Sequence, residues 1–312
     1  LWPTARVSGW FLVRDLARAV IHRVDIVVVG VVLGVEEAAA YAVAAKLVTL
    51  ARRLISSLAR LYFPFASSLS AADDRPALSF LALDGSRTAL VVGLPMTLVL
   101  TALASPIIEA WVGPGYGDAA TVLVILASAQ AVFAVTETWW GLLMGSGHVR
   151  VVATVAIAEA VLNLGTSVVF AHVLGLAGVA LGTLLAVALF ELPVALVLVS
   201  RHTGVPRRAV WSQVLRPHLA PGLLAGAFLA LAAGVVPSQA VAVLVIAAAG
   251  GVLYLLAYVL LSATESERAR LASLRSTLLG RRSKHPTKRS GDVEGVAGGR
   301  NARLPARDAL EE

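Results

Sequence analysis

The sequence contains no cysteine among its 312 residues, and charged residues make up only 14% of it. The absence of cysteine excludes disulfide frameworks, thiolate metal sites and cysteine nucleophiles. Soluble domains carry roughly 25% charged residues, so this chain lacks the charged surface that a water-soluble protein of its size has. What is present is apolar, since 58% of the residues are hydrophobic and the mean hydropathy is +0.82. The composition therefore predicts a membrane protein.

Eight stretches are long and apolar enough to be membrane-spanning helices, because about 20 mostly apolar residues cross the roughly 30 Å hydrocarbon layer. They cover residues 16–35, 38–65, 87–108, 118–145, 150–172, 174–200, 218–236 and 240–263. The connections between them are rich in glycine, proline and aspartate, as at 72–76 and 113–118. The first stretch is the one least able to insert into a membrane on its own, because the N-terminal half of it carries Arg18, His22, Arg23 and Asp25. We expect an all-α integral membrane protein with eight transmembrane helices.

The basic residues predict the orientation of these helices. Every second connection lacks lysine and arginine, whereas the alternate connections carry Arg75, Arg150 and a cluster at 201–216. Cytoplasmic loops are enriched in lysine and arginine, so both termini are expected to be cytoplasmic. The chain then divides into five parts: an N-terminal flank (1–15), a six-helix lobe (16–200), a basic linker (201–217), two additional helices (218–263) and a mostly disordered basic cytoplasmic tail (264–312).

Ionisable side chains recur inside the expected helices at a similar depth from the cytoplasmic side. Charges within a bilayer are costly and usually face a cavity or a partner. Two interpretations stay open for the carboxylates, which either pair with the arginines or couple transport to an ion. The arginines suit phosphate or pyrophosphate oxygens, which a guanidinium binds in a bidentate manner. The candidates for substrate binding are Arg52, Arg53, Lys46 and Asn163, and those for ion coupling or charge pairing are Asp25, Glu137, Glu159 and Glu191.

Motifs of enzymes and of nucleotide binding are missing from the sequence. It has no P-loop, dinucleotide-binding glycine pattern, HExxH or GxSxG, so it predicts neither an enzyme nor a cofactor or metal. The basic tail has no aromatic residues beside its charges, which argues against a nucleic-acid partner. Pro95 and Pro193 interrupt expected helices and are hinge candidates. Close helix packing within the bundle is predicted by Gly-xxx-Gly pairs at 30/34, 141/145, 178/182 and 222/226.

Several short segments carry a family resemblance. Residues 24–30 (VDIVVVG) and 41–47 (YAVAAKL) resemble the opening of the second half of polysaccharide-export flippases. Residues 111–119 (WVGPGYGDA) resemble the outer loop before the tenth helix of those proteins, and the segments 145–150, Asn163 and 175–183 follow in the expected order. The chain thus resembles polysaccharide or lipid-linked oligosaccharide flippases of the multidrug/oligosaccharidyl-lipid/polysaccharide (MOP) exporter superfamily.

The resemblance implies that residues 16–263 are helices 7–14 of a two-lobed flippase. Such a protein carries lipid-linked oligosaccharides, on an undecaprenyl-pyrophosphate-type carrier, from the cytoplasmic to the outer leaflet by alternating access. Basic residues of its cavity hold the pyrophosphate, which suits Arg52 and Arg53. The chain is then a fragment that lacks the first lobe and is inactive alone. Its expected partners are membrane lipids, the lipid-linked glycan and the missing lobe, in a multi-pass arrangement in the plasma membrane.

Two alternatives remain beside the flippase. One is a cation-coupled multidrug exporter of the same superfamily, against which the two helices after the twelfth and the cationic candidates count. The other is a non-transporting membrane scaffold subunit. In a scaffold, the buried charges are expected to pair off completely, and no open cavity should lie between the helices.

Overall fold

The computed structural model describes residues 2–235, 239–265 and 267–268, and every regular element within them is helical. Residues 269–312 lie outside the described part, so the expected disorder of the basic tail stays a prediction. In chain order the elements are α1 (Trp2–Val32), α2 (Val35–Ala71), α3 (Arg75–Ala102), α4 (Ala104–Val112), α5 (Gly117–Gly145), α6 (Val149–Leu185), η1 (Ala186–Glu191), α7 (Leu192–Thr203), α8 (Arg207–Ala209), η2 (Val210–Leu215), α9 (Arg216–Ala233) and α10 (Ala240–Leu261). The elements η1 and η2 are π-helices.

Five helical stretches of the described chain are long and apolar enough to cross a membrane. They are Arg75–Ala102, Gly117–Gly145, Val149–Thr203, Arg207–Ala233 and Ala240–Leu261. These helices confirm the prediction of an all-α membrane protein. Helices α1 and α2 overlap the first two expected spans but are not among the five, because their charged residues lower the hydropathy. The count of eight spans and the cytoplasmic location of the termini stay predictions.

The long stretch Val149–Thr203 contains a reversal of the chain at Gly175. This glycine has φ 62° and ψ −140°, a backbone conformation that residues with a Cβ rarely adopt. A Cβ built on Gly182 would lie 2.9 Å from the backbone nitrogen of Ser167, whereas in a straight helix these residues would be about 22 Å apart. The segments on either side of Gly175 therefore form a helical hairpin, as the two separate spans predicted there require.

Helix α3 begins at Arg75, well before the expected start of its span at residue 87. The cause is local, because the Asp74 carboxylate caps the helix by accepting a hydrogen bond of 3.0 Å from the Ala77 backbone N–H. Pro76 occupies the first turn, where its missing N–H costs nothing. The Asp-Arg-Pro sequence, interpreted above as a connection, is thus the start of a helix.

Two further boundaries differ from the sequence prediction. Helix α1 begins at Trp2, so the segment expected as a flank, 1–15, continues directly into the first helix. The segment expected as a linker, 201–217, is mostly helical, because α8 and η2 run through it. Helix formation in both places extends beyond the apolar stretches by which the spans were located.

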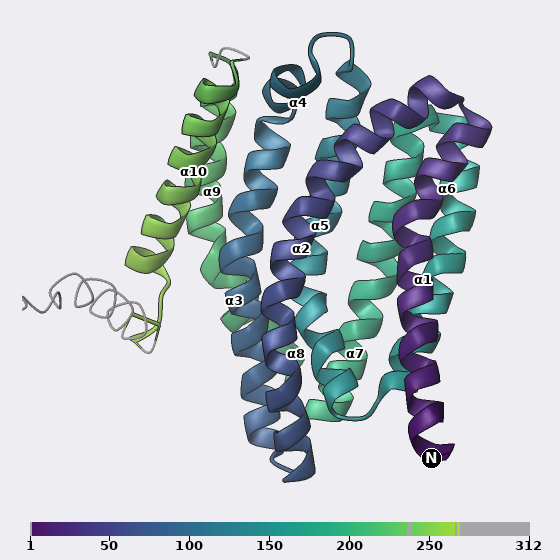
Figure 1. Ribbon diagram of the computed structural model, residues 1–312. Helices are drawn as coiled ribbons and strands as arrows, with labels where there is room; N and C mark the ends of the chain where they lie inside the picture. The colour runs from purple at the N-terminus through teal and green to yellow at the C-terminus, as the bar shows by residue number, and fades with distance from the viewer. Residues whose placement is uncertain (1, 236–238, 266, 269–312) are drawn as a thin grey trace, which may run out of the picture. The chain divides into compact units, whose positions relative to one another are not determined.

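Helix α5 lies among three neighbours and packs against α2, α3 and α6. Helix α1 packs mainly on α6, and the α9–α10 pair attaches mainly to α3 (Figure 1). The buried apolar side chains form two separate clusters. The first cluster includes Ile55 and Trp139, and the second cluster includes Tyr41 and Leu123.

Three of the four glycine pairs predicted for close packing lie at helix contacts within the bundle, whereas Gly34 of the 30/34 pair lies in the turn between α1 and α2 and has no neighbour within 4 Å of a built Cβ. A Cβ on Gly145 of α5 would lie 2.8 Å from the carbonyl oxygen of Phe63 in α2, so the two backbones touch there. Gly222 and Gly226 of α9 face leucine side chains of α3. Gly178 and Gly182 hold the two arms of the α6 hairpin together. These pairs confirm packing between helices of the same chain.

Candidate functional site

Polar side chains form a layer between the two apolar clusters. Along α2, Arg52 lies between Val48 of the second cluster and Ile55 of the first. Gln130 of α5 and Asn163 of α6 likewise lie between residues of the two clusters, and both are fully buried. The layer predicted from the spacing of charges is therefore present, and the neutral polar residues of α5 belong to it.

A cavity of about 290 Å³ reaches this layer between α1, α2 and α5. Four arginines line it, Arg14 and Arg18 from α1 and Arg52 and Arg60 from α2. Glu137 of α5 contributes the carboxylate of the lining. With four guanidinium groups around one carboxylate, the cavity favours a negatively charged occupant. We refer to it below as the arginine cavity.

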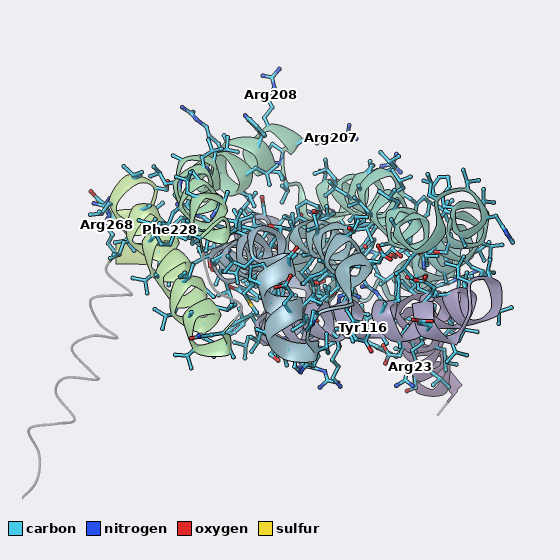
Figure 2. All side chains as sticks on the ribbon, turned by 90° about the horizontal axis from the view of Figure 1, so that it is seen from above. Arg23, Tyr116, Arg207, Arg208, Phe228 and Arg268 are labelled. Carbon is cyan, nitrogen blue, oxygen red and sulfur yellow. The ribbon has the colours of Figure 1, made fainter. Side chains whose placement is uncertain are left out.

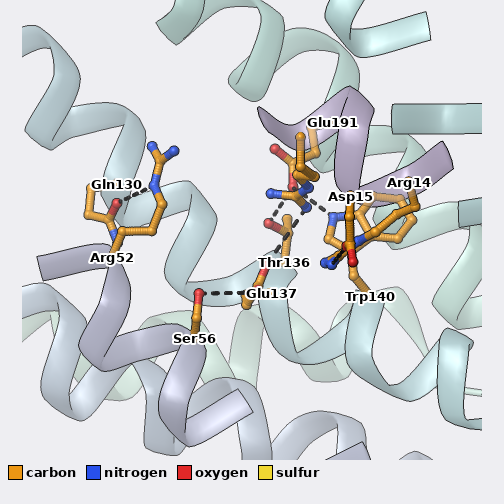
Figure 3. Close-up of polar contacts among 10 residues, drawn as sticks. Arg14, Asp15, Arg52, Ser56, Gln130, Thr136, Glu137, Trp140 and Glu191 are labelled. Atoms are coloured by element: carbon orange, nitrogen blue, oxygen red, sulfur yellow. Dashed lines mark hydrogen bonds and ion pairs between the residues drawn. The ribbon is translucent and has the colours of Figure 1, made fainter. Parts of the chain in front are cut away.

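Two of these arginines converge on one aromatic ring. The guanidinium carbon of Arg52 lies 4.8 Å from the centroid of the Phe133 ring, and that of Arg18 lies 5.6 Å from it. Both distances fall within the cation–π range of about 6 Å. Arg52 is oriented by a hydrogen bond of 3.2 Å from its Nε to Gln130 Oε1 (Figure 3). A cation–π contact uses the face of a guanidinium, so its N–H edge can bind an anion at the same time.

Glu191 is a fixed carboxylate beside the cavity. It is 1% exposed, and its Oε1 accepts hydrogen bonds from Thr136 Oγ1 at 2.8 Å and from Trp140 Nε1 at 2.7 Å (Figure 3). Arg18 Nη2 lies 3.6 Å from the same oxygen and 3.7 Å from Glu137 Oε2. These distances exceed the roughly 2.7–2.9 Å of a charge-assisted hydrogen bond. Helix α5 therefore holds Glu191 in place, and Arg18 is its loosely held counter-ion.

The backbone that presents Glu191 is the π-helix η1. The N–H of Leu192 bonds to the carbonyl of Val187, five residues back, instead of four. The following residue, Pro193, has no N–H, and its ring crowds the carbonyl four residues before it. The proline identified in the sequence thus lies beside a widened helical turn, and such turns are frequent at functional sites.

Asp25 forms a second polar network, held by neutral donors from α2 and from both arms of the α6 hairpin. The carboxylate is 5% exposed and accepts hydrogen bonds from Thr183 Oγ1 (2.7 Å), Tyr41 OH (3.0 Å), Asn163 Nδ2 (3.1 Å) and Ser167 Oγ (3.1 Å). Four donors offset the loss of hydration that a buried carboxylate suffers. The structure therefore brings together the predicted residues Asp25 and Asn163, and adds three hydroxyls to them.

The remaining predicted carboxylates cluster around Arg18, and not around Arg53. Glu137 and Glu191 both form ion pairs with Arg18. Glu159, which is 3% exposed, lies close enough to Glu191 and Arg18 to interact with both electrostatically. Charge pairing and an open cavity are thus both present in the same layer.

Lys46 and Arg53 lie outside the arginine cavity. Both are exposed on α2, together with Thr49, Ser57 and Arg60, and these five residues recur every three or four positions along one face. We refer to them as the polar stripe of α2. Arg52 and Arg53 therefore point in different directions, and of the two only Arg52 lines the cavity. Figure 2 shows other exposed arginines, Arg23 among them, at the edge of the helices.

The sequence interpretation missed several residues of the site, chiefly Arg18, Gln130, Thr136 and Trp140. A signal was available for two of them, because Gln130 and Glu137 are seven residues apart and share a helix face. Arg18 and Asp25 show the same spacing. Thr136 and Trp140 carry no charge, and only the long-range packing of α5 against η1 reveals that they bind Glu191.

Residues 3–121 match the model of a family described as polysaccharide biosynthesis protein. This segment covers α1 to α4 and the beginning of α5, and all four arginines of the cavity lie within it. The chain therefore resembles polysaccharide biosynthesis proteins, as its sequence predicts. A search of curated proteins finds no match.

The fold resembles that of a MOP superfamily transporter from Pyrococcus furiosus, with a TM-score of 0.55 and 17% sequence identity. The likeness covers 81% of this chain and 62% of that transporter, so the chain spans less than two thirds of the transporter's length. That protein is described as having a binding pocket of reverse polarity, which suggests a different function for it. At this level of identity the likeness shows the fold alone. The similarity to polysaccharide biosynthesis proteins and the transporter fold together support a transporter role.

Proposed function

We propose that this chain is part of a flippase that moves lipid-linked oligosaccharide or polysaccharide precursors from the cytoplasmic to the outer leaflet of the plasma membrane. The family match and the fold support a multi-pass membrane transporter. In the proposed alternating-access cycle, this chain supplies one lobe with α9 and α10 appended, and a second lobe faces it. The partners are membrane lipids and a glycan on an undecaprenyl-pyrophosphate-type carrier.

The observation that carries the proposal is the arginine cavity inside a membrane bundle. A pyrophosphate linkage is negatively charged, and guanidinium groups bind phosphate oxygens in bidentate geometry. Ligand pockets usually measure about 300–1,000 Å³, so a cavity of about 290 Å³ fits the pyrophosphate group and leaves no room for the glycan. The glycan would extend along the polar stripe of α2, which meets the cavity at Arg60.

The polar stripe also supports a facing lobe. A helix that exposes Lys46 and Arg53 to hydrocarbon would be costly, since central charges cost roughly 2.5–3.5 kcal/mol each on insertion scales. Such a face is stable in a membrane only against protein or water. A second lobe with a water-filled space between the lobes would cover it, and in that arrangement Lys46 and Arg53 line the shared space.

The two alternative functions account for less of the site. A scaffold subunit would have no use for a cavity in which Arg18 makes no hydrogen bond to any described residue. A cation-coupled drug exporter would need an acidic or apolar cavity for cationic drugs, and four arginines repel them. Asp25, with Asn163 beside it, is the candidate for ion coupling in the proposed flippase as well.

The proposal is tested by measuring the amount of surface polysaccharide in cells that carry each variant of the gene in its chromosomal context. Arg52→Ala combined with Arg53→Ala is expected to abolish export at normal expression, because it removes one anion ligand of the cavity and one cation of the stripe. Cells with Arg52→Ala alone should retain at most a small part of the wild-type export. The matched control is Arg23→Ala, which removes an exposed arginine outside the cavity and should leave surface polysaccharide intact. Unimpaired polysaccharide in the double variant would contradict the proposal.

A further inference from the structure

An apolar groove of about 390 Å³ lies between α3, α5, α7 and the segment formed by η2 and α9. Its wall on α5 runs from Ala131 through Val135 to Trp139, which are four residues apart on one helix face and span about 12 Å. The remaining lining residues are aliphatic, apart from Trp211 and His218. Since Trp211 is 55% exposed, the groove is open at the surface of the bundle.

In a membrane, such a groove is filled by hydrocarbon. All of its walls belong to helical stretches that are long and apolar enough to cross a membrane. Water does not occupy an apolar cavity, and an empty groove forfeits the dispersion contacts of the atoms that line it. The groove follows the axis of α5, and the acyl chains of a bilayer run in the same direction as its spanning helices. A lipid acyl chain therefore matches both the chemistry and the direction of the groove.

The segment beside the open end of the groove is strongly basic. Residues 201–216 contain no acidic residue, and four arginines are exposed in them: Arg201, Arg207, Arg208 and Arg216. Three of these arginines precede Trp211 in the chain, and the fourth directly follows Leu215, another lining residue. Figure 2, seen from above, shows Arg208 pointing away from the helices at the edge of the bundle. Basic side chains at the end of membrane helices attract anionic lipid headgroups.

The π-helix η2 connects the basic side chains to the groove. The N–H of Arg216 bonds to the carbonyl of Trp211, five residues back, and Pro217 follows without an N–H, so η2 repeats the combination of π-helix and proline seen at η1. Trp211 lines the groove and follows Arg208 by three residues, about one helical turn. Tryptophan is enriched at the boundary between membrane and water, where its ring lies at the level of the headgroups. The segment thus has the composition of a membrane surface beside a groove for a chain.

We propose that this groove binds an anionic phospholipid, with one acyl chain in the groove and the phosphate at Arg207 and Arg208. Guanidinium groups bind phosphate oxygens in bidentate geometry. The bound lipid contacts α3, α5, α7 and α9 at once, and it therefore helps to hold the α9–α10 pair on the six-helix lobe. The site goes beyond the proposed function and does not depend on it, because it requires only that the chain lies in a membrane.

The probe is phosphatidylglycerol, compared with zwitterionic phosphatidylcholine of the same acyl chains. Native mass spectrometry of the purified full chain in detergent measures the lipid-bound fraction over a range of lipid concentrations. Phosphatidylglycerol is expected to bind about tenfold more tightly than phosphatidylcholine. Arg207→Gln combined with Arg208→Gln should weaken its binding by about 25-fold, or fivefold for each arginine, and leave phosphatidylcholine unaffected. The matched control, Arg23→Gln combined with Arg75→Gln, removes two exposed arginines elsewhere and should bind as the wild type does.

Ala131→Phe tests the groove itself. Ala131 is half-buried on the groove wall, so the added ring occupies the space of the acyl chain, and binding of both lipids should fall. The matched control is Ala247→Phe, which fills a second apolar groove, between α2, α3 and α10, that contains no residue of η2. It should keep the preference for phosphatidylglycerol. Elution profiles and unfolding temperatures identify variants that fail to fold, and Leu94→Phe narrows the first groove from α3 as a second test.

Each contrary outcome points to a different error. Equal binding of the two lipids to the wild type overturns the role of the arginines. Phosphatidylglycerol binding that persists in both Ala131→Phe and Leu94→Phe overturns the groove as the site and leaves only attraction to a basic surface. Tighter binding of a polyprenyl phosphate than of phosphatidylglycerol overturns the assignment to a phospholipid. The export test of the proposed function changes other residues, Arg52 and Arg53, so the two proposals fail separately.

Discussion

At the scale of single residues, the Asp25 network combines a satisfied carboxylate with an unsatisfied oxygen. Asp25 accepts four hydrogen bonds, while the buried Oδ1 of Asn163 accepts none in the described part of the chain. Hard cations prefer carboxylate, amide and hydroxyl oxygens, and all three kinds converge here. One carboxylate balances one positive charge, so a monovalent cation would match the ion coupling that we propose for Asp25.

Asp25→Asn is therefore expected to remove cation-dependent stability. Sodium chloride in place of choline chloride should raise the unfolding temperature of the purified wild type by roughly 2–4 °C for each 1 kcal/mol of cation binding. The variant should lose this increase, and Asp118→Asn, which changes an exposed aspartate, should retain it. An equal increase in Asp25→Asn and in the wild type would restrict Asp25 to a packing role.

The sequence reveals those site residues whose signal is a charge inside an apolar run. Asp25, Arg52, Glu159 and Glu191 could be predicted on that basis, and the structure places all of them in the polar layer. Their pairing could not, because it depends on which helices meet. Arg18 illustrates the difference: in the sequence it is a charge that weakens the first span, and in the fold it opposes two glutamates more than a hundred residues away.

At the scale of elements, the Arg87 side chain adds hydrogen bonds to the apolar contacts that join α3 to the C-terminal helices. Arg87 of α3 donates from Nε to Tyr258 OH and from Nη2 to the Ser262 carbonyl, both at 2.6 Å, and from Nη1 to the Gln213 carbonyl at 3.3 Å. These acceptors belong to α10, to the residue that follows it and to η2. The sequence placed Arg87 at the edge of a span and gave no sign of this junction.

Arg87→Ala should loosen α10 from the bundle. Hydrogen bonds from a charged group contribute about 1.5–3 kcal/mol each, so we expect at least about 2 kcal/mol of lost stability and faster amide exchange in Ala240–Leu261. Hydrogen–deuterium exchange followed by mass spectrometry measures this directly. Arg75→Ala is the matched control, since its side chain is 70% exposed and such surface pairs contribute little. Unchanged exchange in α10 after Arg87→Ala would show that apolar contacts with α3 suffice.

At the scale of the whole molecule, the absence of cysteine makes the predicted topology directly testable. Any introduced cysteine is the sole thiol in the chain. Asp73, whose side chain is 91% exposed, precedes α3, and Tyr116 precedes α5. The eight-span arrangement with cytoplasmic termini places these two connections on opposite sides of the membrane.

In right-side-out vesicles, Tyr116→Cys is therefore expected to react with an impermeant maleimide, and Asp73→Cys only after the membrane is permeabilised. Inside-out vesicles should reverse the pattern. The cysteine-free chain provides the unlabelled control. Labelling of both positions from one side would mean that α3 and α4 do not cross the membrane between them, and the count of eight would have to be revised.

The arginine cavity has a further consequence in an energised membrane. On the proposed topology it opens toward the cytoplasmic side and reaches Arg18 and Arg52, so the second apolar cluster is the main insulating layer beyond it. A membrane potential falls mostly across the insulating part of its path. Moving one elementary charge through the full potential is worth about 2.3 kcal/mol per 100 mV. Anions that reach Arg18 and Arg52 on this topology therefore experience voltage as well as concentration, and occupancy of the cavity should depend on the electrical state of the cell.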